Sequence, residues 1–179
     1  MNFTIETERI VLRLPLEVDN EKLFELMAEP RITKFLTWEP HQNLDTTKAV
    51  TNGLRNAIDT DAGYHWCIIL GGVVIGLTSL IDVKRTIRTW TLNRAELSYW
   101  ISPDYQGKGL ATEAAEAILK FGFENLSLHK IIVAHAEENV ESKSICKKLG
   151  FTQYALEHDA FEKNGKWHNL IWYELLNKK

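Results

Sequence analysis

One junction near the middle of the chain constrains the fold more than any other segment: an apolar strand leads through a glycine-rich loop straight into a helix. The pattern predicts a strand over Ala95–Ile101, a stop at Ser102-Pro103 and a helix over Leu110–Phe123. Gly107-Lys108-Gly109 stands between strand and helix. Glycines let backbone N–H groups converge, and a helix N-terminus adds free donors and partial positive charge. The junction is therefore a candidate cradle for a phosphate or pyrophosphate group, and Lys108 adds a full charge.

The spacing of this loop excludes two common nucleotide motifs. The Walker A motif requires Gly-x-x-x-x-Gly-Lys-Ser/Thr, which is absent. The dinucleotide fingerprint requires a third glycine, and Thr112 occupies that position. Taken alone, the loop is equally consistent with an ordinary turn between a strand and a helix.

Size and composition limit the classes of protein that this chain can belong to. Its 179 residues are enough for one domain, expected over residues 1–179, and 45% of them are hydrophobic, as in ordinary globular proteins. The formal net charge of −3 and the lack of a clustered basic stripe argue against a nucleic-acid partner. The N-terminus has no signal-peptide pattern, and the longest apolar run, Trp66–Leu77, is too short to span a membrane. We therefore expect a cytoplasmic protein with no membrane partner.

Glycines, prolines and changes of hydrophobic period divide the rest of the chain into short elements. In the first half we expect a strand at Ile10–Leu14 and then a helix that runs from its N-cap Asp19 to Ala28 and ends before Pro30. An irregular segment over Arg31–Asn43 leads to a second helix, which begins at Asp45, Thr46 or Thr47. Two strands follow, at Tyr64–Leu70 and Val73–Ile81, joined by a hairpin turn at Gly71-Gly72. In the second half we expect a buried strand at Lys130–Ala136, a helix at Glu141–Lys148 stopped by Gly150, and strands at Phe151–Leu156 and Trp167–Leu176. These elements predict a single α/β (α+β) domain.

Three motifs resemble one known family. Gln106-Gly107-Lys108-Gly109-Leu110-Ala111 is similar to the Gln/Arg-x-x-Gly-x-Gly/Ala motif of the GNAT superfamily of acyl-CoA-dependent N-acetyltransferases, and Asn139-Val140-Glu141-Ser142 followed by Lys148-Leu149-Gly150-Phe151 resembles its second signature. The first and last segments, residues 7–13 and 165–169, resemble the subgroup of ribosomal-protein N-terminal acetyltransferases. The resemblance implies a GNAT-like domain: a mixed central sheet with an antiparallel N-terminal hairpin, helices on both faces and a CoA cleft between the central strands.

The same resemblance implies acetyl-CoA as the cosubstrate. The pyrophosphate would lie on the N–H groups of residues 107–112, and the pantetheine arm would pair with the strand that precedes the loop, as an added strand does. The residues expected to bind acetyl-CoA are Tyr99, Trp100, Ile101, Gln106, Gly107, Lys108, Gly109, Leu110, Ala111, Thr112, Asn139 and Ser142. Asn139 could instead, or in addition, be a helix N-cap.

Acyl transfer from a thioester requires a neutral amine, a stabilised oxyanion and a proton donor for the leaving thiolate. Glu96 is the candidate general base, acting through water; the alternative is a solvent-facing partner of Arg94 or a lysine. A surface carboxylate with a pKa near 4.3 is a poor base, so catalysis would require burial or a water relay. Ser142 is the candidate acid or thiol contact, with an ordinary first-turn helix residue as the alternative.

The chain departs from the family pattern at Cys146, where many members have a tyrosine. The departure disfavours a mechanism with tyrosine as the general acid and favours the variant with serine in that role, which the resemblance to the ribosomal-protein subgroup implies. Cys146 itself is expected to be a core thiol, because a free cysteine behaves as a small hydrophobe. His129 and His135 lack the partners that would complete a metal site, so no metal is expected.

The acceptor site is expected to involve Trp38, Trp167 and His168, while Asn169 stands where the subgroup usually has an aspartate. The resemblance favours a protein N-terminal α-amine, such as that of a ribosomal protein. Two alternatives stay open: acetylation of a small-molecule amine (an amino acid, a polyamine or an aminoglycoside), and a non-catalytic acyl-CoA sensor. A polycationic acceptor would require an acidic cleft. A homodimer through a late strand edge is also left open.

Overall fold

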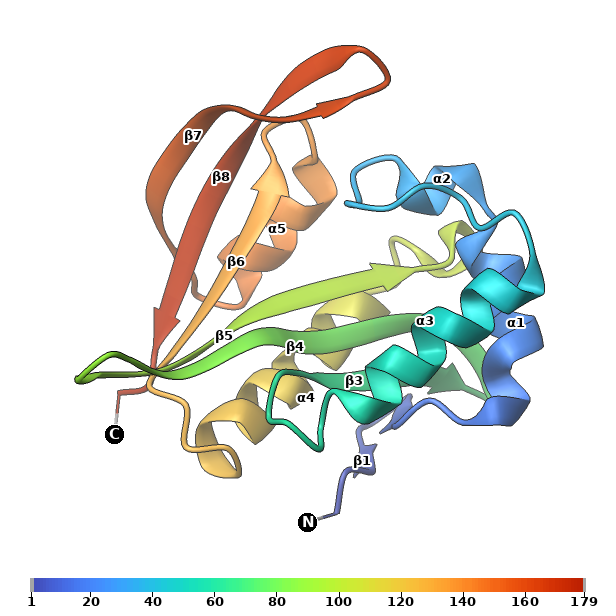
Figure 1. Ribbon diagram of the computed structural model, residues 1–179, viewed down its shortest axis with the longest axis horizontal. Coiled ribbons are helices and arrows are strands. Elements are labelled where there is room, and N and C mark those ends of the chain that lie inside the picture. Colours follow the sequence, from blue (N-terminus) through green and yellow to red (C-terminus); the bar gives the residue numbers. More distant parts are fainter. Residues whose placement is uncertain (1, 179) are drawn as a thin grey trace.

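A mixed sheet of eight strands forms the centre of this computed structural model, which describes residues 2–178 (Figure 1). The strands lie in the order β1-β2-β3-β4-β5-β6-β8-β7. Their bounds are β1 Ile5–Glu6, β2 Val11–Arg13, β3 Tyr64–Leu70, β4 Val73–Ile87, β5 Trp90–Ile101, β6 Lys130–Ala136, β7 Thr152–Lys163 and β8 Lys166–Leu176. Neighbouring strands are antiparallel, except that β5 and β6 run parallel. The predicted fold class is confirmed.

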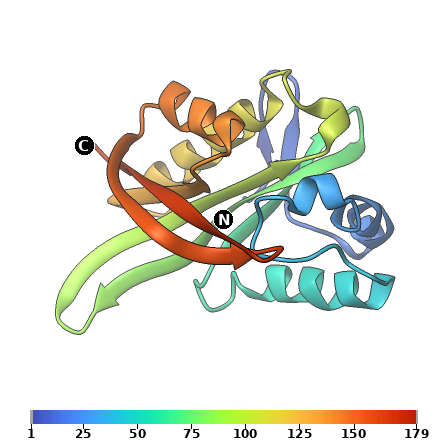
Figure 2. The ribbon, with the colours of Figure 1, turned by 90° about the horizontal axis from the view of Figure 1, so that it is seen from above.

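Helices cover both faces of the sheet (Figure 2). The α-helices are α1 Asn20–Met27, α2 Pro30–Thr33, α3 Leu44–Asn56, α4 Leu110–Glu124 and α5 Val140–Lys148, with short 3₁₀ turns η1 Glu17–Asp19 and η2 Pro103–Tyr105. α1 and α3 lie on one face, and α4 and α5 lie on the other. No helix within residues 2–178 is long and apolar enough to cross a membrane.

Each face of the sheet has its own apolar core, and β3 contributes to both. Trp66 and Ile68 pack into the cluster beneath α4, whereas Cys67 and Ile69 pack into the cluster beneath α1. Successive strand residues point to opposite faces, so a strand covered on both sides is apolar throughout. This arrangement explains the continuous apolar run that the sequence shows there.

The antiparallel half of the sheet contains the expected glycine turn and one further glycine that the packing requires. Gly71 and Gly72 have φ angles of +56° and +83°, which confirms the predicted hairpin. Gly76 in β4 lies opposite Ile101, and a Cβ atom there would overlap the carbonyl oxygen of Trp100. The close approach of β4 and β5 therefore depends on the missing side chain.

Two expectations about the first helices are wrong in detail. Asp19 does not cap α1 with its side chain; its carboxylate instead accepts hydrogen bonds of 2.6 and 2.8 Å from the Arg13 guanidinium. Asp19 stands at the N-cap position, but a bidentate pair with a charged guanidinium outcompetes hydrogen bonds from neutral backbone N–H groups. Pro30 opens α2 as well as ending the preceding helix, because proline fits the first helical position, so the segment expected to be irregular contains a helical turn. The second long helix begins at Leu44, capped by Asn43.

The strands β4 and β5 extend well beyond their predicted ends and form a projecting two-stranded arm (Figure 2). The pairing is irregular between Ile81 and Thr86, and Asp82 adopts a φ of +49°. Such bulges twist a hairpin away from the sheet. The arm has exposed and half-buried residues in alternation and little core, so apolar patterning alone did not predict it. β7 is likewise longer than expected and begins after Phe151.

Candidate active site

The parallel strands β5 and β6 diverge along their length, and we call the space between their diverging backbones the opening (Figure 1). They pair only through Arg94–Lys130, Ala95–Ile131 and Glu96–Ile132. Beyond Glu96, β5 has no strand partner on that edge within the described residues. An unpaired strand edge can hydrogen-bond to an extended ligand. The opening lies where the sequence predicted a cleft, and Tyr99, Trp100 and Ile101 line the β5 side of it.

The glycine loop lies directly after β5 and forms the N-terminus of α4. Gly107 and Gly109 have φ angles of +73° and +78°, so both occupy the left-handed region that favours glycine. The first internal helical bond of α4 runs from the Glu113 N–H to the Gly109 carbonyl. Within residues 2–178, no group accepts a hydrogen bond from the backbone N–H groups of residues 107–112. The loop therefore presents a row of free donors beside a positive helix end.

Arg9, which comes from the segment before β2, hydrogen-bonds to this loop and to the first turn of α4, and the sequence did not predict these contacts. Its guanidinium donates to the Lys108 carbonyl at 2.8 Å and to the Glu113 carboxylate at 2.7 Å. Thr7 also donates to Glu113, at 2.6 Å. Although burial opposes it, these hydrogen bonds hold the pKa of Glu113 below its usual value. Thr7 and Arg9 stood in the opening segment whose resemblance was noted, but nothing in the sequence indicated that they would meet α4.

Two predicted loop residues make internal contacts that shape the turn. The Gln106 side chain donates to the Ile101 carbonyl at 3.3 Å, and the Lys108 ammonium donates to the Asp104 carbonyl at 2.9 Å. The Lys108 ammonium also lies 5.2 Å from the centre of the Tyr105 ring. In this structure the Lys108 side chain therefore folds back against η2, with its ammonium next to Asp104 and Tyr105.

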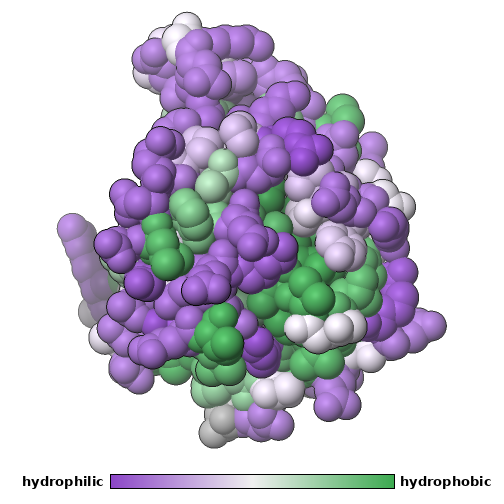
Figure 3. Space-filling view, turned by 90° about the vertical axis from the view of Figure 1, so that its right-hand side faces the viewer, coloured by the Kyte–Doolittle hydropathy of each residue, from purple (hydrophilic) through white to green (hydrophobic). Residues whose placement is uncertain are grey.

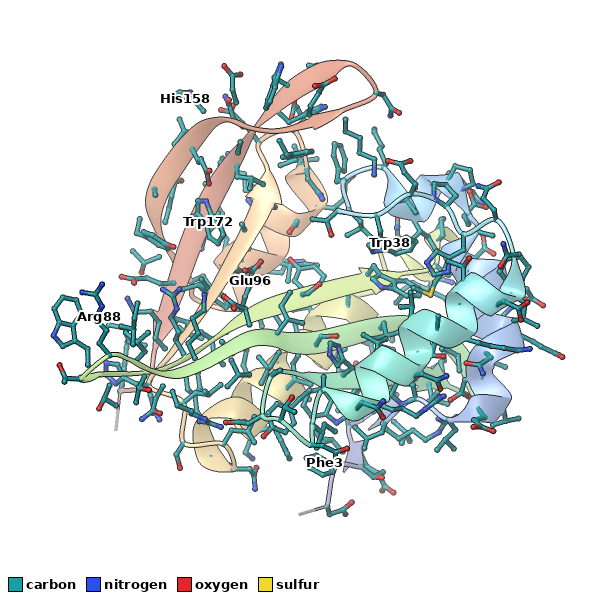
Figure 4. The ribbon with its side chains drawn as sticks, viewed as in Figure 1. Phe3, Trp38, Arg88, Glu96, His158 and Trp172 are labelled. Atoms are coloured by element: carbon teal, nitrogen blue, oxygen red, sulfur yellow. The ribbon has the colours of Figure 1, made fainter. Side chains whose placement is uncertain are left out.

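Glu96 lies at the closed end of the opening, at the last pair of the β5–β6 ladder (Figure 4). Burial, followed by the nearby Asp82 charge, raises its pKa above the ordinary value, while Arg94 and Lys84 oppose the shift. Within residues 2–178, its carboxylate makes no hydrogen bond and no ion pair with Arg94 or a lysine. Glu96 is half-buried, and the ion pair considered as the alternative is not formed within the described residues.

Ser142 lies on the other side of the opening, in the first turn of α5. Its N–H donates to the Asn139 side chain at 3.0 Å, so Asn139 is an N-cap, as one interpretation of the sequence had it. The Ser142 hydroxyl is buried and lies 2.7 Å from the Tyr99 hydroxyl, which crosses from β5. Burial raises the pKa of the Cys146 thiol to about 11, and this thiol lies beside Tyr99 and Ser142. Cys146 is a buried free thiol, as predicted.

The two candidate catalytic groups approach the opening from opposite faces of β5. Strand alternation puts Glu96 and Trp100 on one face and Tyr99 on the other. Trp100 belongs with the core beneath α1, and Tyr99 with the core beneath α4. A reacting group held at the free edge of β5 would thus have the carboxylate on one side and the hydroxyl pair on the other.

Of the predicted acceptor residues, Trp38 lies on the Glu96 face of β5. Trp38 packs edge to face on Trp100, with ring centres 6.1 Å apart. A pocket of about 270 Å³ lies between the segment after α2, which leads to Trp38, and the β7–β8 turn. That pocket is lined by Lys34, Phe35, Lys163, Asn164, Lys166 and His168. His168 therefore faces a cavity, whereas Trp167 is 56% exposed and does not line it. Figure 3 shows the side of the molecule that carries α1, α2 and α3, where apolar side chains gather in a patch within a hydrophilic surround.

Lys163 connects the two walls of this pocket. It is only 8% exposed, and its ammonium donates to the carbonyls of Thr33 and Leu36 at 2.7 Å each and to that of Trp38 at 3.1 Å. The β7–β8 hairpin is thereby fastened over the segment that carries Trp38. Sequence reasoning missed Lys163, because a lysine next to a turn ordinarily indicates a solvent-exposed residue.

We expect Lys163→Met to lower the free energy of unfolding by about 1–3 kcal/mol, because it leaves buried carbonyl groups without donors. Urea unfolding monitored by tryptophan fluorescence measures this change. Lys166→Met is the matched control, since Lys166 lies on the same hairpin but forms only an exposed pair with Glu138. Equal stability of the two variants would contradict the proposed fastening.

No metal site is evident in the described part of the chain. Residues 2–178 contain no group of three or more His, Cys, Asp or Glu side chains that could hold a metal ion. The His135 ring stacks on Tyr173 at 5.3 Å and its Nδ1 bonds to the Ala136 carbonyl. His135 therefore has a packing role in the core between β6 and β8.

Comparisons with known proteins agree with this geometry. A family model described as an acetyltransferase (GNAT) domain matches residues 9–152. YdaF of Bacillus subtilis (strain 168), provisionally named a ribosomal N-acetyltransferase, is 28% identical over 177 residues, which cover 96% of this chain and 93% of YdaF. Spermidine N(1)-acetyltransferase of Escherichia coli (strain K12) is 40% identical over 101 residues, covering 56% of this chain and 51% of that enzyme. The structure of RimL, a ribosomal L7/L12 α-N-protein acetyltransferase in complex with coenzyme A, shares the fold with a TM-score of 0.87 and 17% identity over 97% of both chains.

Proposed function

Because the chain belongs to the GNAT acetyltransferase family, it is an acetyl-CoA-dependent N-acetyltransferase, and we propose that its acceptor is the α-amine at the N-terminus of a protein. The amine must be neutral when it attacks the thioester carbonyl. An α-amine has a pKa of about 7.7–8.0, against about 10.4 for a lysine side chain. A larger fraction of α-amines is therefore neutral near pH 7, and a carboxylate base of moderately raised pKa is sufficient.

The observation that carries this proposal is the charge of the pocket between the segment after α2 and the β7–β8 turn. Its described lining includes Lys34, Lys163, Lys166 and His168. Lys163 pairs with Glu39, and Lys166 and His168 lie against Glu138, so Lys34 is the lining cation with no carboxylate partner in the described part of the chain. A polyamine would meet the like charge of Lys34, whereas a peptide with carboxylates after its N-terminal residue would meet an opposite one. The pocket therefore supports a protein acceptor over a polycationic one.

The comparisons include proteins with names of both kinds. YdaF, whose name refers to ribosomal N-acetylation, matches over almost the whole chain at 28% identity, whereas one spermidine acetyltransferase matches about half of it at 40% and the structure of another shares the fold over 95% of it. A ribosomal protein is the proposed class of partner. Acetylation of a small-molecule amine such as spermidine is the second candidate. A non-catalytic sensor is not favoured, because Glu96 is half-buried, has a raised pKa and has no ion-pair partner in the described part of the chain.

In the proposed mechanism, the free N–H groups of residues 107–112 bind the pyrophosphate and the free edge of β5 holds the pantetheine arm. The acceptor amine enters from the Glu96 face. Glu96 removes a proton from the attacking nitrogen through a water molecule, and a backbone N–H of β5 stabilises the oxyanion. Ser142 lies on the opposite face, next to the departing sulfur. The buried free thiols Cys67 and Cys146 support the cytosol as the compartment.

Thiol release from acetyl-CoA measures the choice of acceptor directly. We expect turnover with peptides that carry a free N-terminal amine followed by acidic residues, and little or none with spermidine or aminoglycosides. Lys34→Glu should raise the KM for the acidic peptide about tenfold, which corresponds to about 1.4 kcal/mol, and this effect should weaken at high salt.

Lys120→Glu is the matched control, because Lys120 is an exposed lysine near the other end of α4. It makes the same charge change far from the pocket and should leave the KM unchanged. Efficient acetylation of spermidine by the wild type, or a KM that does not respond to Lys34→Glu, would instead favour the small-molecule acceptor.

A further inference from the structure

The Tyr99 hydroxyl is the feature of the opening that the candidate acid and base leave unexplained. Tyr99 belongs to β5, three residues beyond the last β5–β6 pair, and its side chain reaches the first turn of α5. It therefore crosses the opening between the two strands on the face opposite Glu96. Along β5, Tyr99 and Glu96 are about 10 Å apart, which places them on either side of one bound thioester.

We propose that Tyr99 is the catalytic acid of this enzyme: its hydroxyl protonates the departing CoA sulfur, and Ser142 orients and supports that hydroxyl. The inference rests on the proposed location of acetyl-CoA in the opening, and it does not depend on the identity of the acceptor.

The hydrogen bond between the two hydroxyls decides which of them can donate outward. Tyr99 Oη and Ser142 Oγ are 2.7 Å apart, and either oxygen can be the donor. When Ser142 donates, the proton of Tyr99 is left free for a third partner. Two other acceptors lie near Tyr99 Oη: the Ser142 carbonyl at 3.5 Å, too far for a strong bond, and the Cys146 thiol, which is a weak acceptor. Ser142 then stabilises the phenolate that forms when Tyr99 gives up its proton.

Protonation states agree with this assignment. Burial raises the pKa of Tyr99, so its hydroxyl is protonated in the resting enzyme, whereas the hydrogen bond with Ser142 lowers that pKa and thereby favours donation to the departing sulfur. Burial also keeps the neighbouring Cys146 protonated. Neither group therefore introduces a negative charge that would repel the leaving thiolate.

In the proposed acetyl transfer, bonds and protons balance. The neutral amine nitrogen forms a bond to the thioester carbon, and the carbon–sulfur bond breaks with its electron pair going to sulfur. Sulfur takes the Tyr99 proton to give the free thiol of CoA. The nitrogen loses one proton through water to Glu96. Glu96 then returns that proton to solvent, and Tyr99 regains one from solvent, so that both groups start the next cycle unchanged.

Tyr99→Phe tests the proposal, because it removes only the oxygen and keeps the ring that packs in the core. We expect kcat to fall about 100-fold, as for loss of a general acid, with the acetyl-CoA affinity measured by calorimetry changed less than about twofold. Tyr173→Phe is the matched control: Tyr173 is also buried, and its hydroxyl has no hydrogen-bond partner in the described structure. Its kcat should stay at the wild-type value.

A double-mutant cycle separates proton donation from packing. Ser142→Ala should lower kcat about tenfold in the wild type and have no further effect in Tyr99→Phe, because the serine acts through the tyrosine. Wild-type kcat in Tyr99→Phe would overturn the proposal. The proposal would also be overturned if the losses of kcat in Tyr99→Phe and Ser142→Ala were additive in the double variant. The same holds if the loss of kcat in Tyr99→Phe came with an equal loss of acetyl-CoA affinity.

The assay uses hydroxylamine as the nucleophile, since it is small, neutral at about pH 7.5 and independent of the acceptor pocket. If the wild type acetylates hydroxylamine but no protein N-terminus, the proposed acceptor is wrong while the Tyr99 comparison is still made. If Tyr99→Phe matches the wild type with both nucleophiles, only the role of Tyr99 is wrong.

Discussion

Replacing Glu96 with glutamine is expected to lower kcat/KM about 100- to 10,000-fold, the range observed when a general base is lost. Glutamine keeps the size and most of the polarity of the side chain, so acetyl-CoA affinity should not change. In the wild type, kcat/KM should rise with pH as Glu96 loses its proton, and then rise further as the acceptor amine becomes neutral. Initial rates of thiol release between about pH 5 and 9 measure both steps.

The same substitution should increase stability at neutral pH. Burial raises the pKa of Glu96 above its ordinary value of 4.5, so the folded state favours the protonated carboxyl. Its contribution to stability is fully present below the unfolded pKa and is lost as pH rises through the raised folded pKa. Glutamine stays neutral at every pH. Glu96→Gln should therefore unfold at a higher temperature than the wild type at about pH 7, and the difference should disappear at about pH 4.

Glu116→Gln is the control for both effects, because Glu116 is an exposed glutamate on α4. Neither kcat/KM nor the thermal midpoint should change measurably in that variant. Full activity in Glu96→Gln would remove the carboxylate from the mechanism. A lower midpoint at neutral pH would mean that the charged form of Glu96 is stabilised by the fold after all.

The second large effect is expected from Gly107→Val, which should abolish measurable acetyl-CoA binding and leave the protein folded. Gly107 has a φ of +73°, which a β-branched residue adopts only with strain, so the loop would turn its N–H groups away from the pyrophosphate. The strain of one such residue, about 1–3 kcal/mol, is less than the usual stability of a domain. Calorimetric titration with acetyl-CoA and far-UV circular dichroism report binding and folding separately.

Gly165→Val provides a matched control for that experiment. Gly165 lies in the β7–β8 turn with a φ of +74°, and both glycines have open space, with no neighbouring atom within 4 Å of the position that a Cβ would take. The two substitutions should lower the thermal midpoint by similar amounts, but only Gly107→Val should lose acetyl-CoA. If Gly107→Val folds and still binds acetyl-CoA with wild-type affinity, the pyrophosphate does not lie on this loop.

The second half of the fold was predicted more closely than the first, because its elements carry stronger local signals. β6 was predicted to the residue, and α4 to within one, since an unbroken apolar run and a helical period of apolar residues mark them clearly. The arm between β4 and β5 was not predicted, because it is held by backbone pairing and buries little apolar surface. Asp19 could not be assigned correctly, because its partner Arg13 offers a stronger interaction than a helix cap does.

In the candidate site, too, some features could be predicted from neighbouring residues and others could not. The loop glycines, the Asn139 cap and the buried thiol of Cys146 follow from residues adjacent in sequence, where backbone geometry and periodicity act locally. That Glu96 is half-buried without an ion-pair partner in the described chain could not be inferred from its sequence neighbours, because its surroundings come from β4 and β6. The same holds for the pairing of Tyr99 with Ser142, which are separated by 43 positions.

By itself, the sequence determined most of the strands and helices in their order along the chain, the glycine loop before α4 and the family, because each depends on short-range spacing. Only the tertiary structure decided which side chains meet: Thr7 with Glu113 across 106 positions, and Lys163 with the Thr33 carbonyl across 130. Those contacts depend on the order of strands in the sheet and on the divergence of β5 from β6. Both are set by the packing of the two cores as a whole, and no local pattern of residues encodes them.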